Sequence, residues 1–452
     1  MKILIAGIGK VGEVLIKQLV AEKNDVTVID SNTKRLEKLV EQYDIMAIQG
    51  NCASIETLKQ AGAAQADLLI VATGSDEVNL LCSMTAHGLN PHIHTVARIR
   101  NPEYAEQAYS MKDIFGLSLA FNPEKQAALE IERLLKFPGF LKRDAFAKGR
   151  VEIVELKIDA GSKLCGVPLI TMYSIIKCRI LVCAVLRNGE TIMPGGHFTL
   201  QAGDKIFVSA TRRDLAILMK NLDIVTHKVR RVIVAGGGAV SYYLAEALSD
   251  ERISVTMIER DAGRCQTLAA MLPKVNLIQG DATDQDLLES EGLSGCDALV
   301  TLTGSDEQNV IISMFGNSRQ IPQIITKLDH MDDAKILNSL PVGSVICPKK
   351  LSCNTILRYV RAMQARTGGA LTIHTIADGQ AEALEFPVDE NTPHCGVPLK
   401  ELKLKKNLLI VCINRGSKTE IPGGNSTFLP GDSVVVVTDK ANLILHLGDI
   451  FE

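Results

Sequence analysis

The chain has no tryptophan, and aromatic residues make up only 4% of its 452 residues. This scarcity argues against base-stacking platforms, and a formal net charge of only −3 argues against a strong field for nucleic acid, so no nucleic-acid partner is predicted. The apolar runs fall far short of the roughly 18 residues needed to span a bilayer. No signal peptide is visible, because the first residues enter a strand directly. We therefore expect a cytosolic protein that reaches a membrane only through a partner.

Paired metal-binding cysteines are also missing, because the 11 cysteines include no C-x-x-C pair. Several cysteines lie among apolar or small residues, where buried reduced thiols are expected. These are Cys52, Cys82, Cys183, Cys265, Cys296 and Cys412. His92 and His94 would share one face of a strand, but a metal site there is the weaker interpretation, and no metal ligand is predicted.

The first dozen residues carry the clearest motif. Lys2 to Ala6 reads as a short buried strand, and Gly7, Gly9 and Gly12 follow with the spacing G-x-G-x-x-G. Glu13 to Val20 then has the apolar spacing of a helix. The dinucleotide-binding fingerprint requires this context, since the turn and the unpaired N–H groups at the helix start can hold a pyrophosphate.

The next strand, Asp25 to Asp30, ends in a carboxylate about 20 residues after the turn, where it can accept hydrogen bonds from ribose hydroxyls. Asp30 favours NAD over NADP, because a 2′-phosphate would lie beside a negative charge, although Lys34 and Arg35 weaken this preference. Lys10 is not a Walker lysine, because no G-K-[ST] has the required spacing. The alternative is a Rossmann-like turn that binds nothing.

Strands predicted at 45–50, 67–73 and 94–98 alternate with helices, which indicates a parallel, doubly wound sheet. Ligands bind such sheets at the carboxyl ends of the strands. Besides the Gly7 turn and Asp30, these ends carry Asn51, the pair Thr73 and Gly74, and Arg98. Arg98 could reach toward phosphates, although a surface ion pair is an equally ordinary role.

A helix is predicted next, with Asn122 as its N-cap, Pro123 in its first turn and its end near Lys136, before Pro138 and Gly139. Its apolar stripe is Ile131, Leu134 and Leu135. The stripe is either intramolecular core or an exposed face that pairs with another copy. The same two interpretations hold for a second helix predicted from 348 to 365.

A smaller unit of about 80 residues follows. Val151 to Ile158 alternates with period two, which predicts a half-buried strand. Ile180 to Leu186 reads as a buried strand, and Asn188–Gly189 predicts a hairpin turn. The pattern is typical of a small α+β domain.

The whole pattern then recurs at an offset of about 229 residues. The strand and glycine turn return at Arg231 to Gly238, and Thr303 to Glu307 repeats the segment T-G-S-D-E of Thr73 to Glu77. Cys395 to Leu399 repeats Cys165 to Leu169. Chance identity cannot hold one offset across so many turns. The sequence therefore predicts two tandem copies of a Rossmann-like, doubly wound α/β domain followed by a small α+β domain.

The second copy keeps the candidate site with changes. Ser241 replaces the third glycine, Glu259 replaces Asp30, and Lys327 replaces Arg98. Serine is small enough for close packing, and glutamate can still reach ribose. This pocket is expected to bind some nucleotide, with a different preference or more weakly. Its candidate residues are Gly236, Gly238, Glu259, Asp281, Thr303 and Gly304.

Together these features resemble the RCK family, also called KTN, of regulators of potassium transport. The signals are G-x-G-x-x-G with Asp30, the paired T-G-S-D-E-x-x-N segments, the run from Arg98 to Tyr104, and the paired C-G-V-P-L and P-G-G turns, over essentially the full length. The resemblance implies NAD(H), with ATP or ADP as further ligands. The contacts it implies in the first copy are Gly7, Ile8, Gly9, Lys10, Val11, Gly12, Asp30, Asn51, Cys52, Thr73, Gly74 and Arg98.

The resemblance also implies a regulatory subunit of bacterial potassium uptake, peripheral on the cytoplasmic side of the inner membrane. Its partner would be an integral potassium channel subunit of the TrkH or TrkG kind, and a homotetramer is expected. The domains predicted are 1–124 and 229–348 for nucleotide binding, 125–143 and 349–367 for connecting helices, and 144–228 and 368–452 for the C-terminal RCK domains.

The mechanism we predict is a population shift, in which a nucleotide that prefers one domain arrangement opens or closes the attached channel. An NAD-dependent oxidoreductase is the main alternative, but it needs an acid or base beside the nicotinamide. The small domains offer no cluster of His, Lys and Tyr for that role, so no catalytic residue and no enzyme activity are predicted. A nucleotide sensor without a membrane partner is the other alternative.

Overall fold

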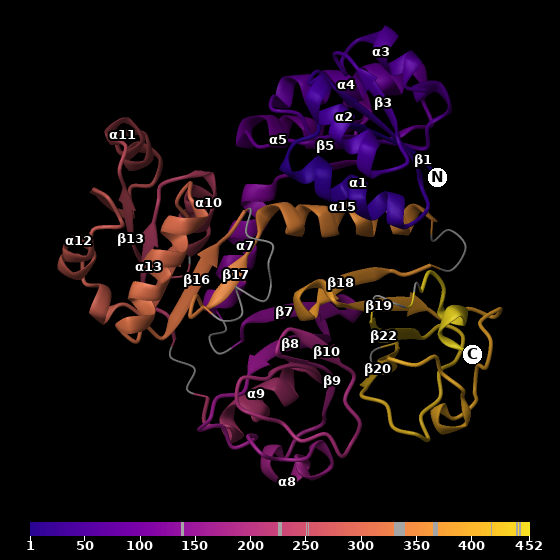
Figure 1. The fold of residues 1–452 in the computed structure, drawn as a ribbon, viewed down its shortest axis with the longest axis vertical. Coiled ribbons are helices and arrows are strands. Elements are labelled where there is room, and N and C mark those ends of the chain that lie inside the picture. The colour runs from indigo at the N-terminus through magenta and orange to yellow at the C-terminus, as the bar shows by residue number, and fades with distance from the viewer. Residues whose placement is uncertain are drawn as a thin grey trace. The chain divides into compact units, whose positions relative to one another are not determined.

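The computed structural model (Figure 1) describes residues 1–136, 140–224, 228–249, 251, 253–329, 340–364, 369–416, 418–439, 442 and 444–452, apart from the side chains of Lys10, Lys148 and Asp378. The chain divides into two compact units. One contains Met1–Ala128 and Cys347–Tyr359, and the other contains Leu129–Ile346 and Val360–Glu452. Over these described ranges, no helix is both long enough and apolar enough to cross a membrane.

The first parallel-sheet domain has six strands in the order β3-β2-β1-β4-β5-β6, all parallel. The strands are β1 (Lys2–Ala6), β2 (Asp25–Asp30), β3 (Met46–Gln49), β4 (Leu68–Val71), β5 (His94–Arg98) and β6 (Leu119–Phe121). The helices are α1 (Lys10–Ala21), α2 (Thr33–Gln42), α3 (Ile55–Gln60), α4 (Asp76–Leu89), α5 (Pro102–Ser110) and α6 (Lys112–Phe115). The strand order reverses between β1 and β4, which is where such sheets bind ligands.

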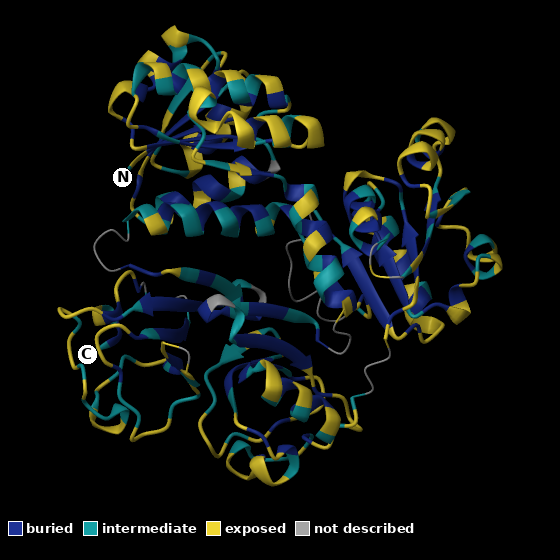
Figure 2. Cartoon of the chain, turned by 180° about the vertical axis from the view of Figure 1, so that it is seen from behind, coloured by how far each residue is buried: buried dark blue, intermediate teal, exposed yellow. Residues whose placement is uncertain are grey.

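The second parallel-sheet domain repeats this topology in the order β14-β13-β12-β15-β16-β17. Its strands are β12 (Arg231–Ala235), β13 (Ser254–Glu259), β14 (Asn276–Gln279), β15 (Ala298–Thr301), β16 (Gln323–Lys327) and β17 (Ser344–Ile346). Its helices include α10 (Ala239–Ser249), α11 (Ala262–Met271), α12 (Gln285–Ser290) and α13 (Asp306–Ser318). The central strands of both sheets are buried and the outer helix faces are exposed (Figure 2), so the predicted duplication is confirmed.

Each copy also has a five-stranded antiparallel sheet, in the orders β10-β9-β11-β8-β7 and β18-β19-β22-β20-β21. The first antiparallel domain contains β7 (Lys142–Phe146), β8 (Val151–Lys157), β9 (Ile180–Arg187), β10 (Glu190–Ile192), β11 (Lys205–Thr211), α8 (Tyr173–Ile176) and α9 (Arg212–Asn221). The second contains β18 (Thr372–Ile376), β19 (Ala381–Pro387), β20 (Leu408–Arg415), β21 (Lys418–Glu420) and β22 (Ser433–Asp439). The predicted Asn188–Gly189 hairpin turn is confirmed by φ angles of 53° and 80°.

The prediction of a half-buried strand at 151–158 is wrong in one respect, because β8 is buried on both faces as far as Leu156. Val154 and Leu156 belong to the core of the first antiparallel domain. Val151 and Ile153 belong to a second core, which also contains buried residues of the second antiparallel domain. The alternation therefore identified the strand correctly, and the face expected to meet water instead meets the other copy.

Two connecting helices each join the parallel-sheet domain of one copy to the antiparallel domain of the same copy. Asn122 caps α7 (Pro123–Lys136) by accepting a hydrogen bond from the Lys125 amide at 2.9 Å, as predicted. The predicted stripe of α7 is buried, with Ile131, Leu134 and Leu135 at most 2% exposed, which favours its interpretation as core. The predicted stop at 138–139 and the predicted end of the second helix at 365 lie outside the described residues.

The second connecting helix, α15 (Pro348–Gln364), belongs as far as Tyr359 to the unit of the first parallel-sheet domain. Within that unit Ser352 donates a hydrogen bond to Gln126 at 2.9 Å, and the Tyr359 hydroxyl lies 2.8 Å from Nδ1 of His94. The helix that follows the second parallel-sheet domain thus packs on the first.

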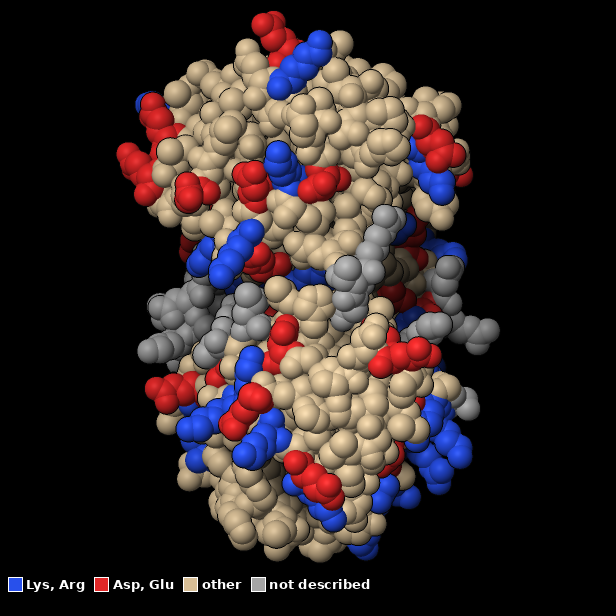
Figure 3. Space-filling model, turned by 90° about the vertical axis from the view of Figure 1, so that its right-hand side faces the viewer, with Lys and Arg blue, Asp and Glu red and all other residues tan. Residues whose placement is uncertain are grey.

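The burial of the cysteines and the distribution of surface charge can be compared with the sequence. The six cysteines predicted to be buried are buried and free. Among the described residues, no group of three or more His, Cys, Asp or Glu side chains could hold a metal ion. On the face drawn in Figure 3, acidic and basic side chains are interspersed.

Candidate functional site

The first candidate site lies where β1 and β4 end side by side. Gly7 follows β1 with a φ of +95°, a conformation that favours glycine. A Cβ at Gly7 would lie 2.9 Å from the carbonyl carbon and oxygen of Ala72 and from the amide of Thr73. The two strand ends therefore meet without room for a side chain, and the structure brings Gly7 and Thr73 together.

The N-terminus of α1 is open. Its N-cap, Gly9, has no side chain to satisfy the first amides, whereas Asn32 and Ser75 cap α2 and α4. Among the atoms that the structure describes beyond its two chain neighbours, a Cβ at Gly9 would meet only the Ala72 carbonyl oxygen, at 3.9 Å. The unpaired amides of the first turn and the helix dipole make this a place for an anion.

The third glycine has a steric role. A Cβ at Gly12 would lie 2.3 Å from the carbonyl oxygen of Gly7, so α1 can pack on the turn only with glycine there. Ile8 and Val11 are buried, at 6% and 5% exposed, which leaves their backbone as the part that could meet a ligand. Lys10 begins the helix.

Asp30 holds the turn and lies at the end of β2. Its carboxylate accepts hydrogen bonds from the amide of Ile8 at 2.7 Å and from the amide of Asn32 at 2.8 Å. Arg35 donates to the Ile8 carbonyl at 3.4 Å. A carboxylate has about four lone-pair positions, so Asp30 keeps acceptors for ribose hydroxyls.

The end of β4 is built around Asn79. The Asn79 side-chain oxygen accepts from the Thr73 amide at 3.0 Å and from the Thr73 hydroxyl at 2.6 Å, and its nitrogen donates to the Arg98 carbonyl at 2.7 Å. The Arg98 guanidinium donates to the Thr73 carbonyl. Burial, followed by the charge of Arg100, lowers the pKa of Arg98. The structure therefore places the Arg98 guanidinium at the carboxyl end of β4, on the Thr73 carbonyl and next to exposed Gly74.

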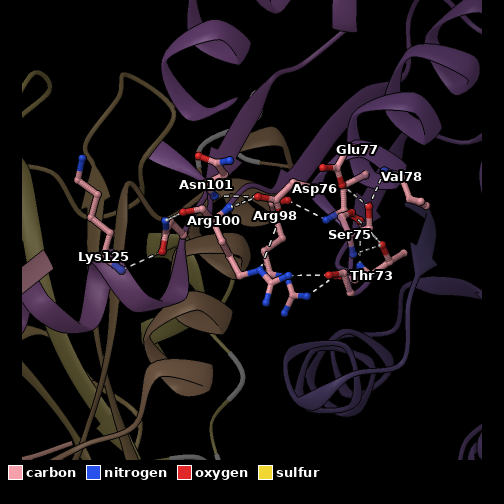
Figure 4. A network of polar contacts seen from close by, with 12 residues as sticks. Thr73, Ser75, Asp76, Glu77, Val78, Arg98, Arg100, Asn101 and Lys125 are labelled. Atoms are coloured by element: carbon pink, nitrogen blue, oxygen red, sulfur yellow. Dashed lines mark hydrogen bonds and ion pairs between the residues drawn. The ribbon is translucent and has the colours of Figure 1, made fainter. Parts of the chain in front are cut away.

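Sequence reasoning did not include the carboxylate that fixes this edge. Asp76 is 6% exposed and accepts from the amides of Arg100 and Asn101, each at 2.8 Å. Arg100 also donates to the Gly74 carbonyl at 2.5 Å and lies 3.7 Å from Asp76 (Figure 4). The signal was available, because the T-G-S-D-E segment with its aspartate recurs in the second copy.

Asn51 and Cys52 differ in how they could serve a ligand. Asn51 is exposed at the end of β3, next to the strand that carries Asp30, and its side-chain oxygen accepts from the Ala53 amide at 3.0 Å. The Cys52 thiol faces the core with Cys82 and Leu58. Its pKa is lowered, first by its contact with Cys82. The buried thiol leaves only the backbone of Cys52 as a part that could meet a ligand.

The second candidate site repeats the first. Gly236 has a φ of +103°, and a Cβ there would lie 2.9 Å from the carbonyl of Leu302. Glu259 accepts from the amide of Gly237 at 2.6 Å and from that of Asp261 at 2.8 Å, as Asp30 does in the first copy. Gly238 is exposed, and a Cβ there would meet no atom within 4 Å. The glutamate thus preserves the anchoring of the turn.

The remaining residues of the second site show where the copies differ. Thr303 donates to Asn309 through its amide and its hydroxyl, each at 2.8 Å, and Gly304 is exposed beside it. Asp281 is exposed, and hydrogen bonds from Thr283 lower its pKa. Lys327 lies 3.8 Å from Asp329. The first copy has Arg98 and Arg100 at these two positions, so the first site carries more positive charge.

The third glycine position is occupied differently in the second copy. Ser241 is fully buried there and its hydroxyl donates to the Gly236 carbonyl at 2.6 Å. The same carbonyl in the first copy lies where a Cβ of residue 12 would be. The start of α1 therefore lies closer to its glycine turn than the start of α10 does, since only α10 leaves room for a side chain there.

These domains match known families. The TrkA-N domain model matches residues 3–118 and 232–348, and the TrkA-C domain model matches residues 153–223 and 383–447. Fold and sites thus define a tandem protein of two TrkA-N and two TrkA-C domains. The chain is 31% identical to a Trk system potassium uptake protein TrkA homolog of Archaeoglobus fulgidus, with 100% of each chain covered. It is 32% identical to the Trk system potassium uptake protein TrkA of Haemophilus influenzae, over 98% of this chain and 97% of that one. The chain belongs to the TrkA family of Trk potassium uptake proteins.

Solved structures show the same architecture. The crystal structure of the GsuK RCK domain covers 97% of this chain and 92% of that chain, with a TM-score of 0.61 at 16% identity. The GsuK channel bound to NAD gives a TM-score of 0.60 at 17% identity, over 97% of this chain and 77% of that chain. At this identity the likeness concerns the fold, and it confirms the predicted pair of RCK modules.

Proposed function

We propose that the protein is the nucleotide-binding regulatory subunit of a potassium uptake system. In this proposal it gates an integral membrane potassium subunit of the TrkH or TrkG type from the cytoplasmic side of the inner membrane. The observation that carries the proposal is the pair of open glycine turns, each anchored by an acidic residue at the end of the neighbouring strand. The family supplies the process, since the relatives are named as potassium uptake proteins.

The ligand that fits the first site best is NAD(H), with ATP and ADP as competitors. The uncapped start of α1 offers amides to a pyrophosphate, and Asp30 offers acceptors to ribose. A neighbour of the same fold is described as bound to NAD. The proposed contacts are Gly7, Ile8, Gly9, Lys10, Val11, Gly12, Asp30, Asn51, the backbone of Cys52, Thr73, Gly74 and Arg98, and in the second site Gly236, Gly238, Glu259, Asp281, Thr303 and Gly304.

The proposed action is mechanical. The domain boundaries we propose are 1–124, 144–228, 229–348 and 368–452, with connecting helices at 125–143 and 349–367. A nucleotide that prefers one arrangement of these domains by about 1–3 kcal/mol shifts the equilibrium about 5- to 150-fold. No chemical step on the nucleotide is part of this proposal.

An oligomeric ring is part of the proposal, with a homotetramer as the expected state. Leu81 and Met84 on α4 are 47% and 40% exposed. Their counterparts on α13, Ile311 and Met314, are 58% and 40% exposed. Apolar residues exposed at the same two positions in both copies are expected where a surface is covered by another subunit.

The test is potassium flux through vesicles that contain a TrkH-type subunit saturated with the regulator, with NADH, NAD, ATP or ADP added in turn. We expect flux to depend on nucleotide with the native protein and not with Asp30→Ala/Glu259→Ala. Asp25→Ala, at the exposed opposite end of β2, is the matched control and should behave like the native protein. Equal flux with and without every nucleotide would contradict the proposal, as would steady oxidation of NADH during the assay.

A further inference from the structure

The two antiparallel domains meet at a pair of residues that occupy the same position in each copy. Asp144 lies on β7 opposite Ile153 of β8, and His374 lies on β18 opposite Ala383 of β19. Both domains lie in the same compact unit and share one apolar core. Equivalent strands thus face one another, as they would in a symmetric dimer of two identical domains.

The pair is in direct contact and largely shielded from water. His374 Nδ1 lies 2.9 Å from a carboxylate oxygen of Asp144, and the two side chains are 17% and 10% exposed. The Phe146 ring packs edge-on against the imidazole, with centroids 4.9 Å apart. The other imidazole nitrogen, Nε2, is buried and has no hydrogen-bond partner among the described residues. The carboxylate of Asp144 is therefore the main polar contact of the imidazole, and the Phe146 ring is its apolar neighbour.

The charged groups around the pair are unevenly divided between the copies. Lys142 lies 3.3 Å from Asp144, and Arg133 lies 2.9 Å from Glu130 on α7. Burial raises the pKa of Glu130. Burial alone would raise the pKa of Asp144 too, but the charges of Lys142 and His374 hold it well below its usual range. Glu155 of β8 faces Lys142 and lies 3.4 Å from Lys205 of β11.

If two first antiparallel domains paired in the same way, Asp144 of one would meet Asp144 of the other. If two second antiparallel domains paired, His374 would meet His374. Two Asp144 carboxylates at hydrogen-bond distance in a dry interface could not both stay ionised without a large cost. Two His374 imidazoles would repel one another once both are protonated. Only the mixed arrangement joins opposite charges.

A second contact points the same way. Gln380 of the second domain donates to the Gly189 carbonyl at 2.6 Å and accepts from the Thr191 amide at 3.1 Å. Its counterpart in the first domain is Arg150, which donates to the Gly416 carbonyl. Arginine has no acceptor, so a pairing of two first domains would leave the Thr191 amide without its partner.

We propose that Asp144 and His374 form a pairing determinant, which makes the first antiparallel domain select the second and reject another copy of itself. The partner that this surface fits is therefore the sister domain, and subunits that assemble side by side do not exchange these domains. The determinant is independent of which nucleotide the protein binds.

The test uses three variants of the full chain: His374→Asp, Asp144→His, and the charge swap Asp144→His/His374→Asp. Each carries reporter cysteines at Arg179 and Asn425, two exposed residues from the two domains that line one cavity of about 630 Å³. A short bismaleimide then gives a one-chain product on a denaturing gel when the domains of one chain are paired. Chains with a single reporter cysteine control for reaction at the native cysteines.

We expect His374→Asp to lower the ratio of paired to separated domains by about tenfold or more, since removing one partner of a buried pair costs more than the roughly 1.4 kcal/mol of that factor. This change appears as a larger share of chains that escape the one-chain product, and the charge swap should restore the native share. Asp144→His is compared with the native protein at the same pH, because addition of the thiolate to maleimide itself slows in acid. It should match the native protein at pH 8.5 and give less one-chain product than the native protein at pH 5.5, which keeps the test decisive even if His374→Asp does not fold. A swap that gives no more one-chain product than the single variants, or an Asp144→His product that stays the same relative to the native protein at both pH values, would overturn the proposal.

Discussion

Gly12→Ser gives the first copy the residue that the second copy has at the same position, and it should weaken nucleotide binding at the first site. In the second copy the serine hydroxyl donates to the turn carbonyl at 2.6 Å. In the first copy a Cβ would lie 2.3 Å from the Gly7 oxygen, whereas comfortable contacts begin at about 3.5 Å. The helix or the turn must therefore move by about 1 Å before the hydroxyl can bond.

This movement has two consequences of different size. Overpacking of this kind costs about 1–3 kcal/mol of stability. The start of α1 also leaves its place beside the turn, so at least one amide loses its bond to the phosphate, which is worth about 1.5–3 kcal/mol for a charged acceptor. The dissociation constant of the first site should therefore rise about 10- to 150-fold.

The assay is calorimetric titration with NADH in a Glu259→Ala background, so that the first site is the one observed. Ser241→Gly in an Asp30→Ala background is the matched control, because it removes a hydroxyl and a Cβ without introducing a clash. We expect it to lower stability by about 1–2 kcal/mol and to leave affinity within about threefold. If Gly12→Ser bound NADH as tightly as glycine does, the steric reasoning about the third glycine would be refuted.

Three further outcomes are expected. Arg100→Asp should weaken ATP binding at the first site about twofold to fivefold in low salt and less in high salt, and Asp329→Arg should strengthen it at the second, as titrations at two salt concentrations would show. Leu81→Glu with Ile311→Glu should reduce the oligomer to smaller species in light scattering, and an unchanged mass would place the contact elsewhere. Asp144→Asn should lower stability at neutral pH, because a carboxylate with a depressed pKa stabilises the fold above about pH 4 and this contribution is lost as the pH falls further, so denaturant midpoints of the variant and native protein should converge in acid.

The parts of the fold that the sequence predicted well are those where a local signal is strong. The strands at 25–30 and 94–98 and the helix at 123–136 have the predicted ends, because apolar runs and capping residues mark them. The duplication was equally clear, since one offset links many turns. The segment with α5 and β6 was not predicted, because short elements after a loop carry little periodicity of their own.

What the sequence could not supply is the direction of side chains and the presence of a partner surface. It placed Cys52 among the ligand contacts, although its thiol turns into the core. It left Arg98 between two roles, and only the structure places its guanidinium on the Thr73 carbonyl. The period-two alternation at 151–158 predicts a strand with one face exposed to solvent. Nothing in a strand of eight residues reveals that the second antiparallel sheet covers this face.

Fusion of the two copies in one polypeptide has an evolutionary consequence. In a dimer of identical chains every substitution at the axis appears twice, so a position on the axis can never hold an acid facing a base. Here each half of the gene mutates separately, so a favourable substitution in one pocket does not change the equivalent residue of the other pocket. The two sites can therefore diverge in evolution while the pair keeps a nearly symmetric geometry.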